Sequence, residues 1–143
     1  MISNQPQIIP GGIYKDNRGQ LDFYNSFDMT PIKRVYFTKH YNTDTIRAWQ
    51  GHIIESRWFI CVSGSFIVKL VGIDDWENPS ESLIAKEFVL DENKQEILYI
   101  PNRFANGFKA LKKNSKLMIL SDYGYNEIEN DQVRFDQNNW TTW

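Results

Sequence analysis

The sequence predicts an all-β fold, and three observations support that prediction. The chain has 143 residues, the size of one domain with a single hydrophobic core. Aromatic residues make up 15% of it, including five Trp and nine Phe, and aromatic residues favour strands. Short runs of β-branched and aromatic residues recur between turn-forming residues, a pattern typical of a barrel or a sandwich. Seven such runs lie at residues 20–24, 32–38, 57–62, 65–71, 87–90, 96–100 and 117–121.

Two short segments between these runs predict turns. Asp16, Asn17, Arg18 and Gly19 are turn-forming residues and come directly before the first run. Ser63-Gly64 joins the runs 57–62 and 65–71, and the pair predicts a tight hairpin between them.

The longer segments are interpreted as a rim loop and a tail. Residues 73–82 carry Asp, Asn and Pro, and loops of this length are often functional. After Tyr123 the chain becomes polar, with apolar residues too sparse for a helix. We therefore expect a single domain over residues 1–143, with residues 124–143 forming a polar and aromatic tail packed on the barrel or on a partner subunit.

Composition and charge argue against two classes of partner. The formal net charge is −2 and the basic residues are scattered, so nucleic-acid binding is not expected. No apolar run reaches the roughly 18 residues of a membrane span, and the first residues lack the pattern of a signal peptide. We expect a cytoplasmic protein without a membrane partner. Cys61 lies in an apolar run and is expected to fill the core rather than to act as a nucleophile.

The segment from Arg47 to Glu55 is the most informative for function. Alternate residues of a strand point the same way, so a His-x-His pair with a downstream Glu can converge on one ion, as in metal-binding cupins. Here Gln50 replaces the first His, and Asn106 stands where a later strand would supply another His. One His, one Glu and two amides are poor ligands for a transition metal, so we expect no metal site.

These segments together resemble a known family. The chain resembles the dTDP-4-dehydrorhamnose 3,5-epimerase superfamily of cupins, and most closely the short dTDP-6-deoxyhexose 3,4-ketoisomerases with WxcM-like cupin domains. The resemblance implies a cupin fold, which is a double-stranded β-helix or jelly-roll barrel, and a homodimer. Its markers are Asp16-x-Arg18-Gly19 and the segments 32–36, 47–55, 101–111 and 121–123.

The resemblance also implies a reaction. The substrate would be a 4-keto-6-deoxyhexose linked to dTDP or UDP, and the enzyme would be a cofactor-independent isomerase. A base removes the acidic proton at C3, an enediolate forms, and return of the proton to C4 moves the ketone. Returning it to the opposite face of the same carbon would make the enzyme a 3,5- or 3-epimerase instead. Because Gln50 replaces the first site histidine, a binding protein without turnover is a further alternative.

Four residues are expected to carry the chemistry. His52 is the candidate base, since an imidazole with a pKa of about 6.5 is substantially neutral at physiological pH; otherwise it is a core histidine. Tyr36 and Tyr123 match positions near the site of the family and could donate protons, or could be barrel tyrosines. Arg47 would polarise the keto oxygen or hold a phosphate, or would form a surface salt bridge.

The remaining candidates are expected to bind substrate. Glu55 lies three residues after His52 and would face the opposite side of a regular strand, although a bulge could make the two converge. Strand alternation allows only one of Lys33 and Arg34 to face inward. Asn106 could bind sugar hydroxyls or be a turn residue, and His40 is expected in a solvated loop. The full predicted substrate-binding set is Gln50, Asn106, Lys33, Arg34, Arg18, Arg103 and Glu55.

Overall fold

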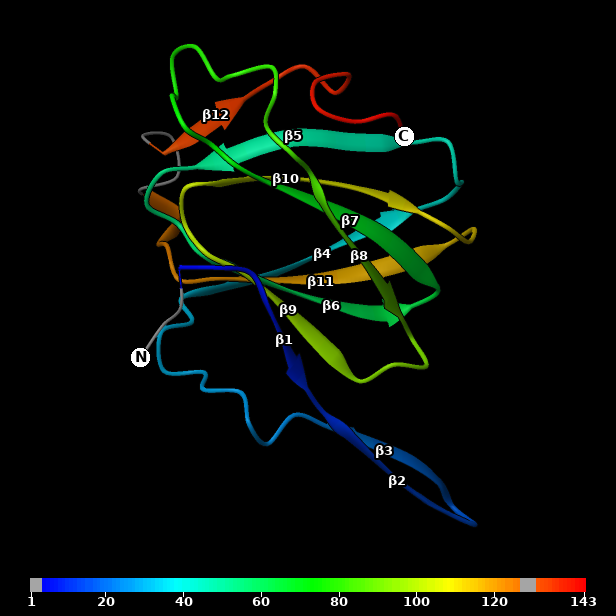
Figure 1. Ribbon diagram of the computed structural model, residues 1–143. Coiled ribbons are helices and arrows are strands. Elements are labelled where there is room, and N and C mark those ends of the chain that lie inside the picture. Colours follow the sequence, from blue (N-terminus) through cyan, green and yellow to red (C-terminus); the bar gives the residue numbers. More distant parts are fainter. Residues whose placement is uncertain (1–3, 127–130) are drawn as a thin grey trace.

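The computed structural model describes residues 4–126 and 131–143, and it consists of two packed antiparallel sheets and a projecting hairpin (Figure 1). The first sheet has the order β1 (Gln7–Pro10), β9 (Glu96–Ile100), β6 (Arg57–Ser63), β11 (Ser115–Ser121), β4 (Arg34–His40). The second has the order β12 (Gln132–Arg134), β5 (Ile46–His52), β10 (Phe104–Ala110), β7 (Ser65–Gly72), β8 (Lys86–Asp91). The hairpin pairs β2 (Gly12–Asp16) with β3 (Gly19–Phe23). This single all-β domain confirms the predicted fold class.

The main core lies between the facing sides of the two sheets. Strand β7 shows how alternation builds it, because Phe66, Val68 and Leu70 point inward and are fully buried. Lys69 points to the other side of the sheet. Cys61 belongs to this core, and burial raises the pKa of its thiol to about 12, which makes it inert as predicted.

The two predicted turns have different outcomes. The turn at Asp16 to Gly19 is confirmed, since it connects the paired strands β2 and β3, and Gly19 has a φ of 144°. The hairpin predicted at Ser63-Gly64 is wrong. Strand β6 pairs with β9 and β11, whereas β7 pairs with β8 and β10, so Gly64 carries the chain from one sheet to the other. A local turn pattern specifies a reversal of direction but not which strands will pair.

The C-terminal residues pack on the barrel of their own chain. Strand β12 pairs with β5 at the edge of the second sheet (Figure 1). Beyond it, the rings of Trp140 and Trp143 lie 5.6 Å and 5.5 Å from the ring of Trp49, and Trp49 Nε1 donates to the carbonyl of Asn139. Lys69 Nζ donates to Thr141 Oγ1 at 2.8 Å and so holds the end of the chain. Residues 127–130 of the predicted tail lie outside the described residues.

No helix long and apolar enough to cross a membrane occurs within residues 4–126 and 131–143.

The two positive-φ glycines give a stability prediction. At Gly64 the φ is 76°, and an added Cβ would lie 2.0 Å from Ser115 Oγ, so Gly64→Ala combines backbone strain with a clash. We expect it to lower the free energy of unfolding by about 2–4 kcal/mol. Gly19→Ala is the matched control, because its φ is also positive but no atom lies within 4 Å of the added Cβ. Gly19→Ala should lower the free energy of unfolding by less than Gly64→Ala does. Equal losses in the two variants, measured by urea unfolding, would contradict this explanation.

Candidate active site

An open cavity of about 350 Å3 lies between the two sheets, and we refer to it as the central cavity. Both sheets supply its walls. Its polar lining residues are Tyr36 and Thr38 on β4, Arg47 and Gln50 on β5, Arg57 on β6, Asn106 on β10 and Arg134 on β12.

A bulge in β5 lets Arg47 and Gln50 reach the same cavity although they are three residues apart. Asn106 pairs with Gln50 and Phe108 pairs with Arg47, so β5 uses one residue more than β10 over this stretch. Trp49 points to the opposite side, where it packs against the C-terminal aromatic residues. The bulge thus allows Trp49 to pack on the outer side of the sheet while Arg47 and Gln50 face the cavity.

The central cavity is electropositive. Three guanidinium groups line it, from Arg47, Arg57 and Arg134, and none of its described lining residues is a carboxylate. Arg57 is almost fully buried, and its Nη1 donates to Gln50 Oε1 at 3.1 Å. Burial raises the pKa of Tyr36, while the adjacent Arg57 partly opposes that change, so the phenol remains protonated at neutral pH. The arrangement suits an anionic ligand that accepts hydrogen bonds.

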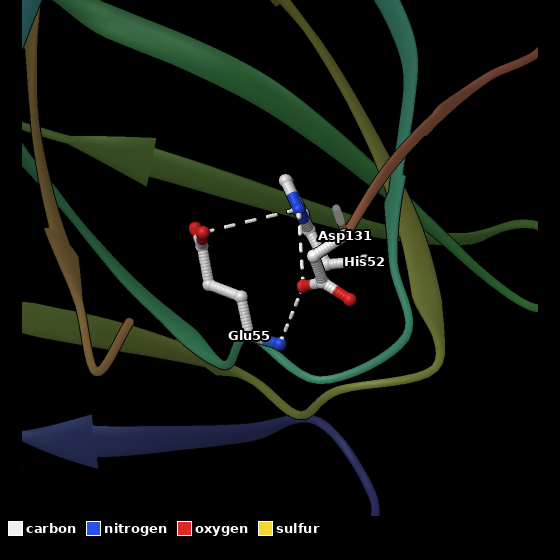
Figure 2. A group of neighbouring side chains, drawn as sticks. All are labelled: His52, Glu55 and Asp131. Carbon is white, nitrogen blue, oxygen red and sulfur yellow. Dashed lines mark hydrogen bonds and ion pairs between the residues drawn. The ribbon is translucent and has the colours of Figure 1, made fainter. Parts of the chain in front are cut away.

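Beside the cavity, His52 forms a buried cluster with Glu55 and Asp131 (Figure 2). His52 Nδ1 lies 3.9 Å from Glu55 Oε1 and 3.8 Å from Asp131 Oδ2. The expectation for a regular strand does not hold, because β5 ends at His52 and the chain then turns. This turn brings Glu55 back to the side of His52, so the two side chains converge without a strand bulge between them.

Asp131 fixes the turn that follows β5. Its Oδ1 accepts the backbone N–H groups of Ile53 and Ile54 at 2.9 Å and 2.7 Å, and its Oδ2 accepts that of Glu55 at 2.8 Å. Hydrogen bonds from backbone N–H groups to an ionised carboxylate are among the stronger ones in proteins. A residue near the C-terminus therefore sets the geometry around His52.

His52 is neutral at physiological pH. It is 4% exposed, and neither ring nitrogen has a hydrogen-bond partner among the described residues. Burial, with Arg57, Arg34 and Arg134 in smaller measure, lowers its pKa to about 3. His52 is not among the residues that line the central cavity. Gln50, two residues earlier on β5, does line the cavity.

The His52 cluster is a poor fit for a metal ion, although its three ligand types could bind one. Both carboxylates are already engaged: Glu55 pairs with the guanidiniums of Arg34 and Arg57, and Asp131 accepts three backbone N–H groups. A cation would have to displace these donors and withstand repulsion from the guanidiniums of Arg34 and Arg57. The carboxylates are better explained as the partners of those arginines and of the turn.

The other predicted site residues are distributed unevenly. Tyr36, Arg47, Gln50 and Asn106 line the central cavity. Arg34 faces inward and lies 3.1 Å from Glu55, whereas its neighbour Lys33 is exposed, as alternation requires. Neither of these two lines the central cavity, and three further predicted residues do not line it either: Arg18 is on the projecting hairpin and pairs with Asp16, Arg103 is in the exposed turn before β10, and Tyr123 follows β11.

Sequence reasoning missed four residues of the site, Arg57, Arg134, Asp131 and His40. Nothing local marks Arg134 or Asp131, because their place depends on the pairing of β12 with β5. The prediction that His40 lies in a solvated loop is wrong: it is the last residue of β4, it is 2% exposed, and Arg47 Nε donates to its Nε2 at 3.0 Å. Extending the run 32–38 by two residues would have placed His40 on the face of Tyr36.

Comparisons with known proteins give relatives of similar sequence and of similar fold. The probable low-salt glycan biosynthesis epimerase Agl13 of Haloferax volcanii is 25% identical over 130 residues, which are 85% of this chain and 81% of that protein. The Mycobacterium tuberculosis rmlC epimerase has a similar fold, with a TM-score of 0.80, 19% identity and coverage of 100% of this chain and 76% of that chain. The sugar 3,4-ketoisomerase QdtA of Thermoanaerobacterium thermosaccharolyticum, in complex with TDP, has a TM-score of 0.71 and 23% identity, and the match covers 94% of this chain and 90% of that chain.

These proteins are described as epimerases and a sugar isomerase, and the sequence relative Agl13 supports an enzyme of this class. The family model described as FdtA: WxcM-like, C-terminal matches residues 4–140, nearly the whole chain. The protein therefore belongs to the FdtA family of WxcM-like C-terminal domains.

Proposed function

We propose that the protein is a cofactor-independent isomerase of the 3,4-ketoisomerase type, acting on a nucleotide-linked 4-keto-6-deoxyhexose. The observation that carries the proposal is the convergence of three guanidiniums in a cavity whose described lining residues include no carboxylate. Such a cavity complements the two negative charges of a nucleoside diphosphate. Among proteins of similar fold, QdtA is known in complex with TDP-4-keto-6-deoxyglucose and the 3′-monoepimerase ChmJ in complex with dTDP-quinovose.

The proposed chemistry is enolisation. A base takes the proton from C3 of the sugar, and the electrons of that C–H bond form the C3–C4 double bond as the ketone oxygen becomes an oxyanion. Arg47 or Arg57 stabilises that oxyanion, and Tyr36, held protonated by burial, donates a hydrogen bond to it. Return of the proton to C4, with transfer of the C3 hydroxyl proton to the oxyanion at C4, leaves a ketone at C3 and a hydroxyl at C4. Neither redox chemistry nor a change in electron count is required.

His52 is the proposed proton acceptor. Its neutral imidazole can accept a proton, and it stands two residues after Gln50 on β5, where alternation turns side chains to the same face. Its low pKa makes it a weak base in the free protein. Bound diphosphate would neutralise Arg57 and Arg134 and so remove part of the cause of that low pKa. Transfer also requires the imidazole to become accessible from the central cavity.

One observation favours a second candidate, a nucleotide-sugar-binding protein without turnover. Gln50 lies at the cavity wall, where the resemblance expects a catalytic histidine, and its amide oxygen accepts a hydrogen bond from Arg57. An amide cannot act as a general base at neutral pH. The 3,5- and 3-epimerase alternatives use the same enolisation at C3 and differ in where the proton returns.

Two further expectations stay predictions, the homodimer and the cytoplasmic location. The β2–β3 hairpin projects from the barrel and exposes Ile13, Tyr14 and Leu21, which supports an intermolecular contact there (Figure 1).

Deuterium exchange tests enolisation directly. We expect dTDP-4-keto-6-deoxyglucose in heavy water to acquire deuterium at C3 when the protein is added, as followed by proton NMR. The variant His52→Ala should slow this exchange by about 10²–10⁴-fold, the usual contribution of a general base. Lys94→Ala is a control, because Lys94 is exposed in the turn between β8 and β9 and does not line the central cavity. An unchanged rate in His52→Ala would remove His52 from the role.

The substitution Gln50→His separates the two candidate functions. It places an imidazole on the wall of the central cavity, where the electropositive surroundings keep it neutral at pH 7. We expect faster exchange at C3 in this variant than in the wild type, measured with the same substrate. Exchange in Gln50→His alone would favour the binding candidate, whereas tight dTDP binding with no exchange in either protein would contradict the enolisation proposal.

The low pKa of His52 predicts a pH-dependent stability. The unfolded histidine titrates near pH 6.5 and the folded one near pH 3, so between these values the unfolded chain binds more protons. The free energy of unfolding should therefore fall as the pH drops below 6.5, and His52 should contribute about 2 kcal/mol of that loss by pH 5. Urea unfolding of the wild type and His52→Gln at pH 5 and pH 7 measures it. The same pH dependence in both proteins would show that His52 is not the cause.

A further inference from the structure

His40 is a buried polar residue next to the central cavity. Its ring centroid lies 5.4 Å from that of Phe66, edge to face, and 5.5 Å from that of Phe108, in a stacked arrangement. Phe108 itself lines the cavity. Because rings from β7 and β10 hold the imidazole on two sides, its orientation is set by the core and not by solvent.

The contact between His40 and Arg47 defines the protonation state of the histidine. Arg47 Nε donates to His40 Nε2 at 3.0 Å, so Nε2 must carry a lone pair. The neutral ring then has its proton on Nδ1, which is buried and has no partner among the described residues. The unpaired Nδ1–H costs free energy because it is buried. The fold accepts this cost and keeps Nε2 as the acceptor for Arg47.

We propose that His40 is a positioning residue, which holds the guanidinium of Arg47 at the cavity wall by accepting its Nε–H. This inference rests on the proposed function, since Arg47 is there assigned to the bound anion. Over residues 4–126 and 131–143, Arg47 makes no ion pair, and its two terminal nitrogens have no hydrogen-bond partner in the protein. With Nε anchored, those nitrogens are presented to a ligand, and less side-chain freedom is lost on binding.

The same contact makes the position of Arg47 sensitive to pH. Phe66 and Phe108 face His40 from β7 and β10, Ser115 is opposite it on β11, and Arg47 on β5 is the charged group that faces it among the described residues. Burial, and then Arg47, lower the pKa of His40. When the pH falls through that value, Nε2 gains a proton and can no longer accept from Arg47. Ligand affinity should therefore fall with pH through loss of this anchor.

A double-mutant cycle tests the positioning role, with dTDP as the probe and affinity measured by calorimetry at pH 7.5. His40→Phe keeps a ring between Phe66 and Phe108 but removes the acceptor. We expect it to weaken dTDP binding about fivefold to tenfold in the wild-type background, the size of one typical net hydrogen bond, because His40 acts on the ligand only through Arg47. In an Arg47→Ala background the same change should have no further effect. Equal losses in both backgrounds would overturn the inference.

His40→Gln is the conservative variant, because its amide oxygen can accept from Arg47 Nε but does not titrate. It should keep nearly wild-type affinity at pH 7.5 and lose the part of the pH dependence that His40 causes. A binding profile that is the same in His40→Gln and wild type, from pH 7.5 down to the lowest pH at which both proteins stay folded, would contradict the pH coupling.

Nitrogen-15 NMR of the imidazole separates this inference from the proposed function. If the wild type does not bind dTDP, the proposed function fails, but the contact can still be observed. We expect His40 as the tautomer with its proton on Nδ1, and a shift of the Nε2 resonance in Arg47→Ala. A proton on Nε2 in the wild type would overturn the positioning role whether or not dTDP binds.

Discussion

The carboxylate of Asp131 is the contact on which the geometry of the site depends. It accepts three consecutive backbone N–H groups at the turn after β5. The contact joins the C-terminal segment to the barrel at the point where His52 and Glu55 converge. Three residues further along, the same segment supplies Arg134 to the central cavity. The hydrogen bonds of this one carboxylate thus fix both the turn that holds Glu55 beside His52 and the segment that carries Arg134.

Charge is partitioned across that wall. The carboxylates of Glu55 and Asp131 lie outside the central cavity and are saturated by arginines and by backbone donors, while three guanidiniums line its interior. Arg57 belongs to both sides, since its Nε contacts Glu55 and its Nη1 contacts Gln50. Glu55 compensates for the cost of burying Arg57, and it does so without adding a carboxylate to the cavity lining. An anionic ligand gains most from such an arrangement.

The two histidines of the chain are both buried and neutral, but their surroundings differ. His52 is surrounded by carboxylates and guanidiniums and has no hydrogen-bond partner among the described residues, whereas His40 lies among phenyl rings and accepts a hydrogen bond from an arginine of the cavity. Gln50 occupies the position between them on the cavity wall. An amide therefore lines the cavity, and the two imidazoles lie next to it. Which group removes the proton from the sugar thus decides the chemistry.

Much of the fold followed from the sequence because strand formation is largely local. Alternation and turn residues located most strands of the two sheets, the Asp16–Gly19 turn, the inward choice between Lys33 and Arg34, and the buried place of Cys61. The strand pattern did not single out Arg47, Gln50 or Asn106, because the predicted runs include neither β5 nor β10; these residues and Tyr36 were chosen from the resemblance to the cupin family. The sequence by itself also determined that an amide, and not an imidazole, stands at position 50.

The tertiary structure decided the remainder, because those features depend on contacts between distant segments. Gly64 connects one sheet to the other, and it does not form a hairpin. The turn after β5 brings the side chain of Glu55 close to that of His52. Asp131 and Arg134 enter the site through strand pairing across some 80 residues of chain. The depth at which His52 is buried, and the burial of His40 beside Arg47, result from packing around them. No local pattern encodes the dielectric surroundings of an imidazole, so its basicity is a property of the folded chain.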